Sequence, residues 1–180
     1  MTEILWHGRG GQGAFTAAKL LGAAYSLGSE EKYALAFPSF GPERRGAPIR
    51  AFTKLDTKPI GDRSEIEKAD KCIYLDDTLF TEKAFSELKE DGVIIINSRR
   101  EYSDKRVIAI DADGIAKETL GRPITNTVML GLLGGLGDTV SVDEVVKAIE
   151  EQMPQKLHSK NIEAVKKAAE KIKALKEGAE

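Results

Sequence analysis

Three short runs of almost uninterrupted apolar residues constrain the fold of this chain more than any other feature. They lie at residues 71–75 (KCIYL), 93–97 (VIIIN) and 107–111 (VIAID). Runs of this length and content are typical of strands that are covered on both faces of a sheet. Between the first two, residues 78–89 carry apolar side chains at helical spacing, and Asp91-Gly92 supplies a helix stop. Strands that alternate with helices predict an α/β protein with a mostly parallel sheet.

The remaining segments extend this pattern toward both ends of the chain. Further short strands are predicted at residues 4–7, 33–37 and 49–53. Helices are predicted at residues 14–27, 127–136, 161–176, and from a capping box at residues 141–144 through residue 153. A chain of 180 residues can bury roughly 70% of its unfolded surface, and no repeat or linker divides it. We therefore expect a single domain over residues 1–180, with a three-layer Rossmann-like sheet and a helical C-terminal part.

The composition excludes several classes of protein. With 41% hydrophobic and 31% charged residues, the chain is too apolar for a disordered protein, and no apolar run approaches the roughly 20 residues that cross a bilayer. Its 27 basic and 29 acidic residues leave a net charge of −2, so no overall field favours nucleic acid or an anionic membrane. The first residues, Met1-Thr2-Glu3, lack the features of a signal peptide. We expect a cytoplasmic protein that binds neither nucleic acid nor a membrane.

The count of potential metal ligands is equally restrictive. One cysteine, Cys72, and two histidines, His7 and His158, are too few for an iron–sulfur cluster or a multi-ligand zinc site. We therefore expect no metal and no disulfide within the chain. Cys72 is predicted to be a buried, unreactive thiol, and His7 a hydrogen-bonded core histidine rather than a catalytic base. Asp76 and Asp77 follow a strand, where helix capping explains them more simply than magnesium binding. No catalytic residue is assigned.

A glycine-rich turn joins the first predicted strand to the first predicted helix. Its sequence, Gly8-Arg9-Gly10-Gly11-Gln12-Gly13, fits the G-x-G-x-x-G pattern, in which backbone N–H groups approach a phosphate at the positive end of a helix. The acid that a nicotinamide site needs at the end of the second strand is missing, because that strand ends in Leu35-Ala36-Phe37-Pro38. A phosphate loop of the Walker A type is excluded by Ala14-Phe15. The glycines therefore indicate either an anion contact or close packing of strand and helix.

A loop rich in glycine, proline and charge follows the second predicted strand. It contains the adjacent arginines Arg44 and Arg45, with Glu43 before them. This loop and the glycine turn both follow strand C-termini, so we expect them at the same edge of the sheet. The two guanidinium groups then either bind one phosphate or carboxylate, or one pairs with Glu43 while the other is solvated or meets a partner chain. Arg99-Arg100 also follows a strand; this pair either adds positive charge at the same edge or, like most such pairs, is merely solvated.

With these segments in place, the sequence resembles the gamma subunits of the pyruvate:ferredoxin oxidoreductases, also called pyruvate synthases, in the 2-oxoacid:ferredoxin oxidoreductase family. The joint presence of the glycine turn with Gln12 and the Gly-Pro-Glu-Arg loop is specific to that family. The likeness covers most of the chain up to about Gly135. The matching stretches are WHGRGGQGA at residues 6–14, AFPSFGPERRGAPIRAF at residues 36–52 and NTVMLG at residues 126–131.

The resemblance implies a non-catalytic but necessary part of an enzyme complex. In this family a 2-oxoacid is decarboxylated on thiamine diphosphate, electrons leave through iron–sulfur clusters to ferredoxin, and the acyl group passes to coenzyme A. The thiamine diphosphate, magnesium and clusters are expected on the partner alpha, beta and delta subunits, and ferredoxin is an indirect partner. Coenzyme A is the ligand that the resemblance implies for Gly8, Arg9, Gly10, Gly11, Gln12 and Gly13, together with Arg44 or Arg45.

Two other functions remain open from the sequence. The first is a gamma subunit that serves a branched-chain, aryl or 2-oxoglutarate oxidoreductase, since the acid is selected on other subunits. The second is a self-sufficient nucleotide-binding protein with a Rossmann-like fold, which the glycine turn alone also fits.

Overall fold

The computed structural model describes residues 1–42 and 44–178, and in it six strands form one sheet. The strands are β1 (Thr2–Arg9), β2 (Tyr33–Pro38), β3 (Pro48–Asp56), β4 (Ala69–Tyr74), β5 (Leu88–Asn97) and β6 (Val107–Ile110). Their order across the sheet is β2-β3-β1-β4-β5-β6. Of these six strands, β3 alone runs in the direction opposite to the other five. The expected mostly parallel sheet is confirmed.

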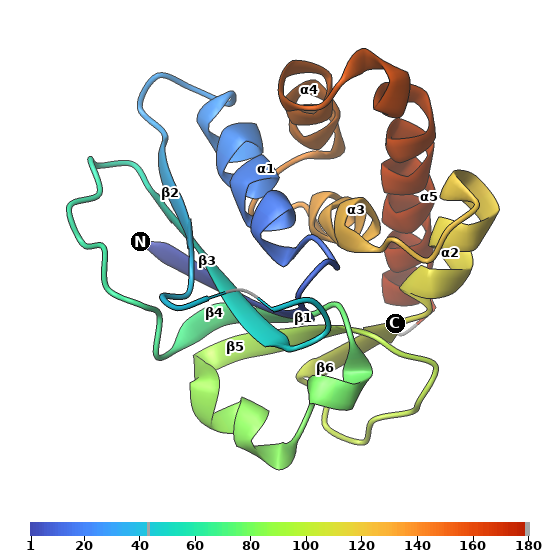
Figure 1. Cartoon of the computed structure of the whole chain (residues 1–180), viewed down its shortest axis with the longest axis horizontal. Coiled ribbons are helices and arrows are strands. Elements are labelled where there is room, and N and C mark those ends of the chain that lie inside the picture. Colours follow the sequence, from blue (N-terminus) through green and yellow to red (C-terminus); the bar gives the residue numbers. More distant parts are fainter. Residues whose placement is uncertain (43, 179–180) are drawn as a thin grey trace.

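The two faces of the sheet are covered by different kinds of structure (Figure 1). One face carries α1 (Ala14–Ser26), α2 (Ala112–Leu120), α3 (Asn126–Leu136), α4 (Val142–Gln152) and α5 (His158–Glu177). The other face is covered by two short 3-10 helices, η1 (Asp77–Leu79) and η2 (Glu82–Glu87), and by loops; a third, η3 (Gln155–Leu157), leads into α5. The three-layer α/β class with a helical C-terminal part is therefore confirmed. Within the described residues, no helix has both the length and the apolar content to cross a bilayer.

Alternation along β1 divides the core between the two faces. Ile4 and Trp6 pack beneath the α-helices, whereas Leu5 packs in the cluster on the opposite face. All three side chains are fully buried. Burial of an aliphatic side chain such as that of Ile4 or Leu5 stabilises the fold by about 1.5–3 kcal/mol. The indole Nε1 of Trp6 donates to Oγ1 of Thr53 at 3.0 Å, so its polar atom is also satisfied.

Helix α3 lies beneath the other helices and is buried from Asn126 to Gly135. Its glycines allow α5 to approach closely: a Cβ at Gly131 would lie 2.7 Å from Cα of Val165, and one at Gly135 would lie 2.8 Å from Cα of Ala169. Contacts this short are not tolerated between real Cβ atoms and backbone, so larger residues would force the helices apart. The glycine-punctuated pattern of this segment therefore reflects helix packing.

Two predictions about local structure are corrected. In place of the expected helix at residues 78–89, the segment forms the two short 3-10 helices η1 and η2. Extended backbone at Phe80 and Thr81 separates them, because Phe80 packs against Tyr74 and Phe85 under the sheet. The expected stop at Asp91-Gly92 lies inside β5, at a shift of the β4–β5 register. Tertiary packing outweighs the local helical spacing here. Helix α2 was not predicted, whereas the capping box of α4 at Ser141 is confirmed.

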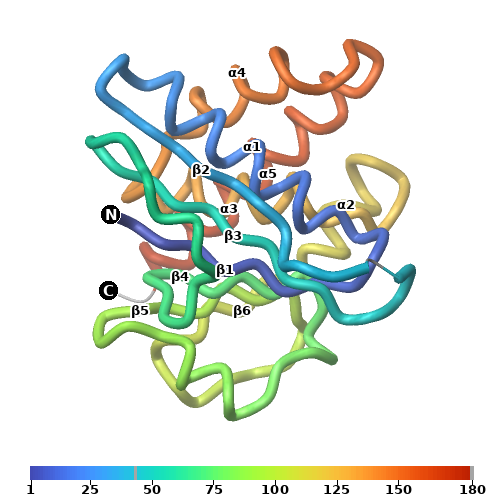
Figure 2. Tube along the Cα trace, turned by 60° about the vertical axis from the view of Figure 1, so that its left-hand side comes forward, coloured from blue at the N-terminus to red at the C-terminus, as the bar shows by residue number. Residues whose placement is uncertain are grey.

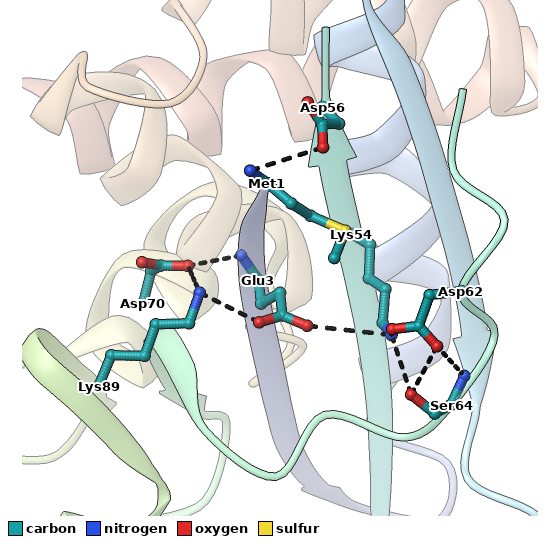
Figure 3. A network of polar contacts seen from close by, with 8 residues as sticks. All are labelled: Met1, Glu3, Lys54, Asp56, Asp62, Ser64, Asp70 and Lys89. Carbon is teal, nitrogen blue, oxygen red and sulfur yellow. Dashed lines mark hydrogen bonds and ion pairs between the residues drawn. The ribbon is translucent and has the colours of Figure 1, made fainter. Parts of the chain in front are cut away.

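A network of charged side chains joins the strands at the N-terminal end of β1 (Figure 3). The ammonium group of Lys54, on β3, is fully buried and lies 2.7 Å from Oδ2 of Asp62 and 3.9 Å from Oε1 of Glu3. Lys89 bridges Glu3 and Asp70 at 3.0 and 2.7 Å. These pairs attach the segment between β3 and β4 to the sheet, at the edge opposite to the glycine turn.

Candidate functional site

The glycine turn lies where β1 ends and α1 begins. Gly11 and Gly13 have φ angles of +92° and +83°, a region that glycine adopts without the steric cost that a Cβ would bring. Gly13 is the N-cap of α1, no side chain caps this helix within the described residues, and its first turn contains no acid. The first N–H groups of α1 therefore carry the positive end of the helix dipole with no side-chain acceptor, which favours an anion.

The loop that carries the two arginines lies beside this turn (Figure 2), and backbone hydrogen bonds join the two. The amide of Gly10 donates to the carbonyl of Ala47 at 2.9 Å, and the amide of Gly46 donates to the carbonyl of Gly10 at 3.0 Å. A Cβ at Gly10 would collide with the carbonyl oxygen of Arg44 and lie 2.8 Å from its carbonyl carbon. The loop and the turn leave the same sheet edge, as expected from the sequence. Gly10 thus also has a packing role, although its partner is this loop rather than the helix.

The side chains of Arg9 and Gln12 brace the turn from within. The guanidinium of Arg9 donates to Oδ2 of Asp76 at 3.2 Å, to the carbonyl of Gly46 at 3.0 Å and to Oγ1 of Thr78 at 2.9 Å. Oε1 of Gln12 accepts from the amide of Arg9 at 2.7 Å, and its Nε2 donates to Oδ2 of Asp76 at 3.1 Å. Arg9 is thereby held by protein acceptors, so it orients the turn and the loop in addition to supplying positive charge.

The sequence predicts a capping role for Asp76 but not its contacts with Arg9 and Gln12 of the glycine turn. It follows β4, which pairs in parallel with β1, and it caps η1 by accepting from the amide of Thr78 at 3.0 Å. Partial burial raises the pKa of the Asp76 carboxyl, but hydrogen bonds from Thr78 and Gln12 and the charge of Arg9 outweigh burial and leave the pKa below its ordinary value. The capping role is confirmed. Its contact with Arg9 follows only once β1 and β4 are known to be neighbours.

Arg44 and Arg45 are both exposed but meet the turn differently. Arg44 presents its backbone carbonyl to Gly10. Arg45 forms a bridge with Gly10 and places its side chain beside Gly11, where a Cβ would lie 3.8 Å from Cγ and 4.0 Å from Nε of Arg45. The alternative in which an arginine pairs with Glu43 lies outside the described residues. The structure therefore brings the side chain of Arg45, rather than that of Arg44, over the glycine turn.

Asn126, at the start of α3, lies against the same turn. Its Nδ2 donates to the carbonyl of Gly13 at 3.5 Å, and a Cβ at Gly13 would lie 2.6 Å from that nitrogen. Its Oδ1 accepts from the amide of Thr127 at 2.9 Å. The three stretches that carry the family resemblance therefore meet at one place, although more than 100 residues separate Gly13 from Asn126 in the sequence.

A cleft of about 490 Å³ extends from Gln12 along the C-terminal ends of β4, β5 and β6. Arg99 and Arg100 line it, as expected, but Arg99 pairs with Asp111 at 3.0 Å and Arg100 with Asp77 at 3.5 Å. The cleft is therefore mixed in charge rather than positive. Within the described ranges, no group of three or more His, Cys, Asp or Glu residues is arranged to hold a metal ion.

His7 and Cys72 lie apart from the glycine turn on the other face of the sheet. Nε2 of His7 is 2.8 Å from Oε2 of Glu87, and its ring stacks on that of Tyr74 with centroids 4.3 Å apart. The prediction of a hydrogen-bonded core histidine is confirmed. Cys72 is fully buried, and burial, together with the charge of Glu87, raises the pKa of its thiol to about 12. The predicted buried thiol is confirmed as well.

Comparisons with known proteins agree along the whole chain. The family model for pyruvate ferredoxin/flavodoxin oxidoreductase matches residues 3–171. The chain is 48% identical over 180 residues to pyruvate synthase subunit PorC of Methanothermobacter thermautotrophicus, covering 98% of each. It is 42% identical to the common gamma subunit of the pyruvate/ketoisovalerate oxidoreductases of Pyrococcus abyssi, covering 95% of this chain and 97% of that one. The crystal structure of pyruvate oxidoreductase subunit PORC from Thermotoga maritima has a TM-score of 0.79 at 34% identity, covering 94% and 95%.

These matches include the glycine turn, the arginine loop and Asn126. They confirm the resemblance to gamma subunits and the expectation that the chain is a subunit of an oxidoreductase. The chain belongs to the pyruvate ferredoxin/flavodoxin oxidoreductase family.

Proposed function

We propose that this chain is the gamma subunit of a cytoplasmic pyruvate:ferredoxin oxidoreductase and that it holds coenzyme A for acyl transfer. The reaction oxidatively decarboxylates pyruvate to acetyl-CoA and passes the electrons to ferredoxin. The observation that carries the proposal is that the glycine turn and the arginine loop form one hydrogen-bonded unit at the end of the parallel strands, with the start of α1 uncapped and the side chain of Arg45 beside Gly11. Residues 1–180 act in it as one gamma-type domain.

The chemistry of this unit fits the phosphates of coenzyme A. Coenzyme A carries a diphosphate and a 3′-phosphate, and both helix N-terminal N–H groups and guanidinium groups bind phosphate oxygens well. Arg45 supplies an exposed cation beside the turn, and Arg9 supplies one that is held by protein acceptors. The proposed contacts are Gly8, Arg9, Gly10, Gly11, Gln12, Gly13, Arg45 and, as the weaker of the two adjacent arginines, Arg44.

The contribution to rate is orientation. When coenzyme A is held by its phosphates, its thiol is delivered repeatedly to an acyl group that a partner subunit carries. Orientation of this kind reaches effective molarities of roughly 10⁵ M or more, so no general base is needed on this chain. This agrees with a site that consists of backbone amides, glycines and cations.

The residues of this chain do not fit the redox and thiamine cofactors of the reaction. Its one cysteine is fully buried in the sheet, and no metal-binding group occurs within the described residues. We therefore assign thiamine diphosphate, magnesium and the iron–sulfur clusters to the alpha, beta and delta subunits of the complex, with ferredoxin as an indirect partner.

The choice of 2-oxoacid also belongs to other subunits under this proposal. The Pyrococcus abyssi relative is named as a subunit common to pyruvate and ketoisovalerate oxidoreductases, so one gamma chain serves two acids in that organism. That observation favours a second candidate, in which this chain serves a related 2-oxoacid oxidoreductase with the same role toward coenzyme A.

The test uses the complete complex with coenzyme A as the varied substrate. We expect Arg45→Ala to raise the KM for coenzyme A at least about tenfold, the cost of one charge-assisted phosphate contact, and Arg44→Ala to raise it less. Arg63→Ala is the control, because Arg63 is an exposed arginine on the segment between β3 and β4, away from the turn. The KM for pyruvate is expected to stay unchanged in all three variants. An unchanged KM for coenzyme A in both loop variants removes the arginine role.

A further inference from the structure

Phe40 is the most exposed large apolar side chain among the described residues. It is 80% exposed, whereas Met1, the next, is 52% exposed. It lies in the loop between β2 and β3, on the same loop as Arg45. Single exposed apolar side chains are common on protein surfaces, so exposure by itself indicates nothing. What distinguishes Phe40 is how firmly the structure holds it.

Two successive contacts between aromatic rings connect Phe40 to the core. Phe52 is fully buried, its ring centroid lies 5.1 Å from that of Phe37, and Phe37 lies 6.5 Å from Phe40. The backbone is also fixed: the amide of Phe40 donates to Oε1 of Glu65 at 3.2 Å, and Glu65 in turn accepts from Nη2 of Arg50 at 2.7 Å. The backbone at Phe40 is therefore attached to the sheet, which lowers the cost of ordering this part of the loop when a partner covers it.

The surface around Phe40 is hollowed on two sides. Two hollows, of about 490 and 360 Å³, share Ser39, Phe40, Pro48, Ile49 and Arg50 in their walls. The first continues to His7 and Leu79, and the second to Phe15 and Pro42. An exposed aromatic residue between two hollows has the shape of an interface hot spot, where side chains of a partner pack around an anchor.

We propose that Phe40 and its two hollows form the surface on which this chain docks to the subunit that carries the acyl group. The inference rests on the proposed function. Arg45 is five residues beyond Phe40, so the two lie at most roughly 18 Å apart even in a fully extended chain. The thiol of a coenzyme A molecule bound at Arg45 must reach the acyl group of a partner. That partner must therefore cover this edge of the sheet, and Phe40 is the rigid apolar feature that it meets there.

Charge favours a different subunit over a second copy of this chain. Arg44 and Arg45 lie on the same loop, and Lys19 stands over the ring of Phe15 at 4.7 Å beside one hollow. Glu65, the acid that lines one of these hollows, is already paired with Arg50 at 2.7 Å. A symmetric contact between two copies would bring both sets of cations together at a cost, because it repeats the same patch on each side. The surface instead fits a partner with an apolar pocket for Phe40 and a rim of carboxylates.

The experiment measures the affinity of this chain for the remaining subunits of the complex. We expect Phe40→Ala to weaken it at least about tenfold, as for an aromatic anchor, and Phe40→Asp to weaken it further. Leu175→Ala, which changes a 45% exposed side chain on α5, is the matched control and should bind like the wild type. Thermal unfolding of the isolated variants should be unchanged, because Phe40 is exposed. The proposal is overturned if both Phe40 variants bind the other subunits with wild-type affinity. It is also overturned if Phe40 is needed for self-association of this chain but not for its binding to the other subunits.

The same variants separate this inference from the proposed function. If Arg45→Ala leaves the KM for coenzyme A unchanged while Phe40→Ala weakens assembly, the docking surface stands and the coenzyme A site is wrong. If Arg45→Ala raises that KM while assembly is indifferent to Phe40, the coenzyme A site stands and the docking surface is wrong.

Discussion

Substitution of Gly10 by alanine tests whether the glycine turn and the arginine loop act as one unit. A Cβ at this position would collide with the carbonyl oxygen of Arg44, which is backbone and cannot rotate away as a side chain would. The loop must therefore move outward as a whole. That movement breaks the two hydrogen bonds that join Gly10 to Ala47 and to Gly46.

The size of the effect follows from those two bonds. A backbone hydrogen bond contributes about 1 kcal/mol net, so losing both lowers the free energy of unfolding by about 2 kcal/mol. This value agrees with the about 1–3 kcal/mol that overpacking of a tight contact usually costs. The loop also carries Arg45 away from Gly11, so the KM for coenzyme A should rise together with the loss of stability.

Urea unfolding of the purified chain measures the first effect, and the fluorescence of Trp6, the one tryptophan, reports it because its ring is fully buried. Gly61→Ala is the matched control, since a Cβ at Gly61 meets nothing within 4 Å. We expect that variant to be as stable as the wild type or slightly more stable. A Gly10→Ala chain within about 0.5 kcal/mol of the wild type, with an unchanged KM for coenzyme A, would refute the argument.

Three further predictions concern groups away from this contact. Asp62→Asn should destabilise the chain more than Lys54→Met does. The first variant leaves the fully buried ammonium of Lys54 with the carboxylate of Glu3, 3.9 Å away, as its remaining ionic partner, whereas the second removes the buried charge. Equal urea midpoints of the two variants would contradict this. Cys72 should resist iodoacetamide in the folded chain at pH 8, because burial raises its pKa to about 12, and modification at the rate of a free thiol would show the thiol to be accessible. The pKa of Asp76 lies below its ordinary value of 3.8, so its carboxylate contributes stability that is present above about pH 4 and is lost as the pH falls through the lowered pKa. Asp76→Asn should therefore flatten the fall in stability below about pH 4, and an unaltered acid limb in a pH series of thermal unfolding would count against it.

Features of this protein that depend on short-range pattern can be predicted from its amino-acid sequence. Apolar runs near residues 71–75, 93–97 and 107–111 are strands because a segment covered on both faces must be apolar throughout. The turn at residues 8–13 was recognisable because a strand, glycines and a helix follow one another directly. The capping box at Ser141 was recognisable for the same reason, since both of its partners lie within three residues.

Features that depend on residues far apart in the chain become visible in the folded protein alone. Residues 78–89 have helical spacing, yet Phe80 and Phe85 are recruited under the sheet and the segment forms 3-10 turns instead. The strand order places β4 beside β1, so Asp76 meets Arg9 across 67 positions of sequence, and no local pattern encodes that contact. The choice of Arg45 over Arg44 is of the same kind. Local propensity acts over a few residues, whereas the position of a loop against a turn is set by which strands pair, and pairing is settled by burial of the whole sheet.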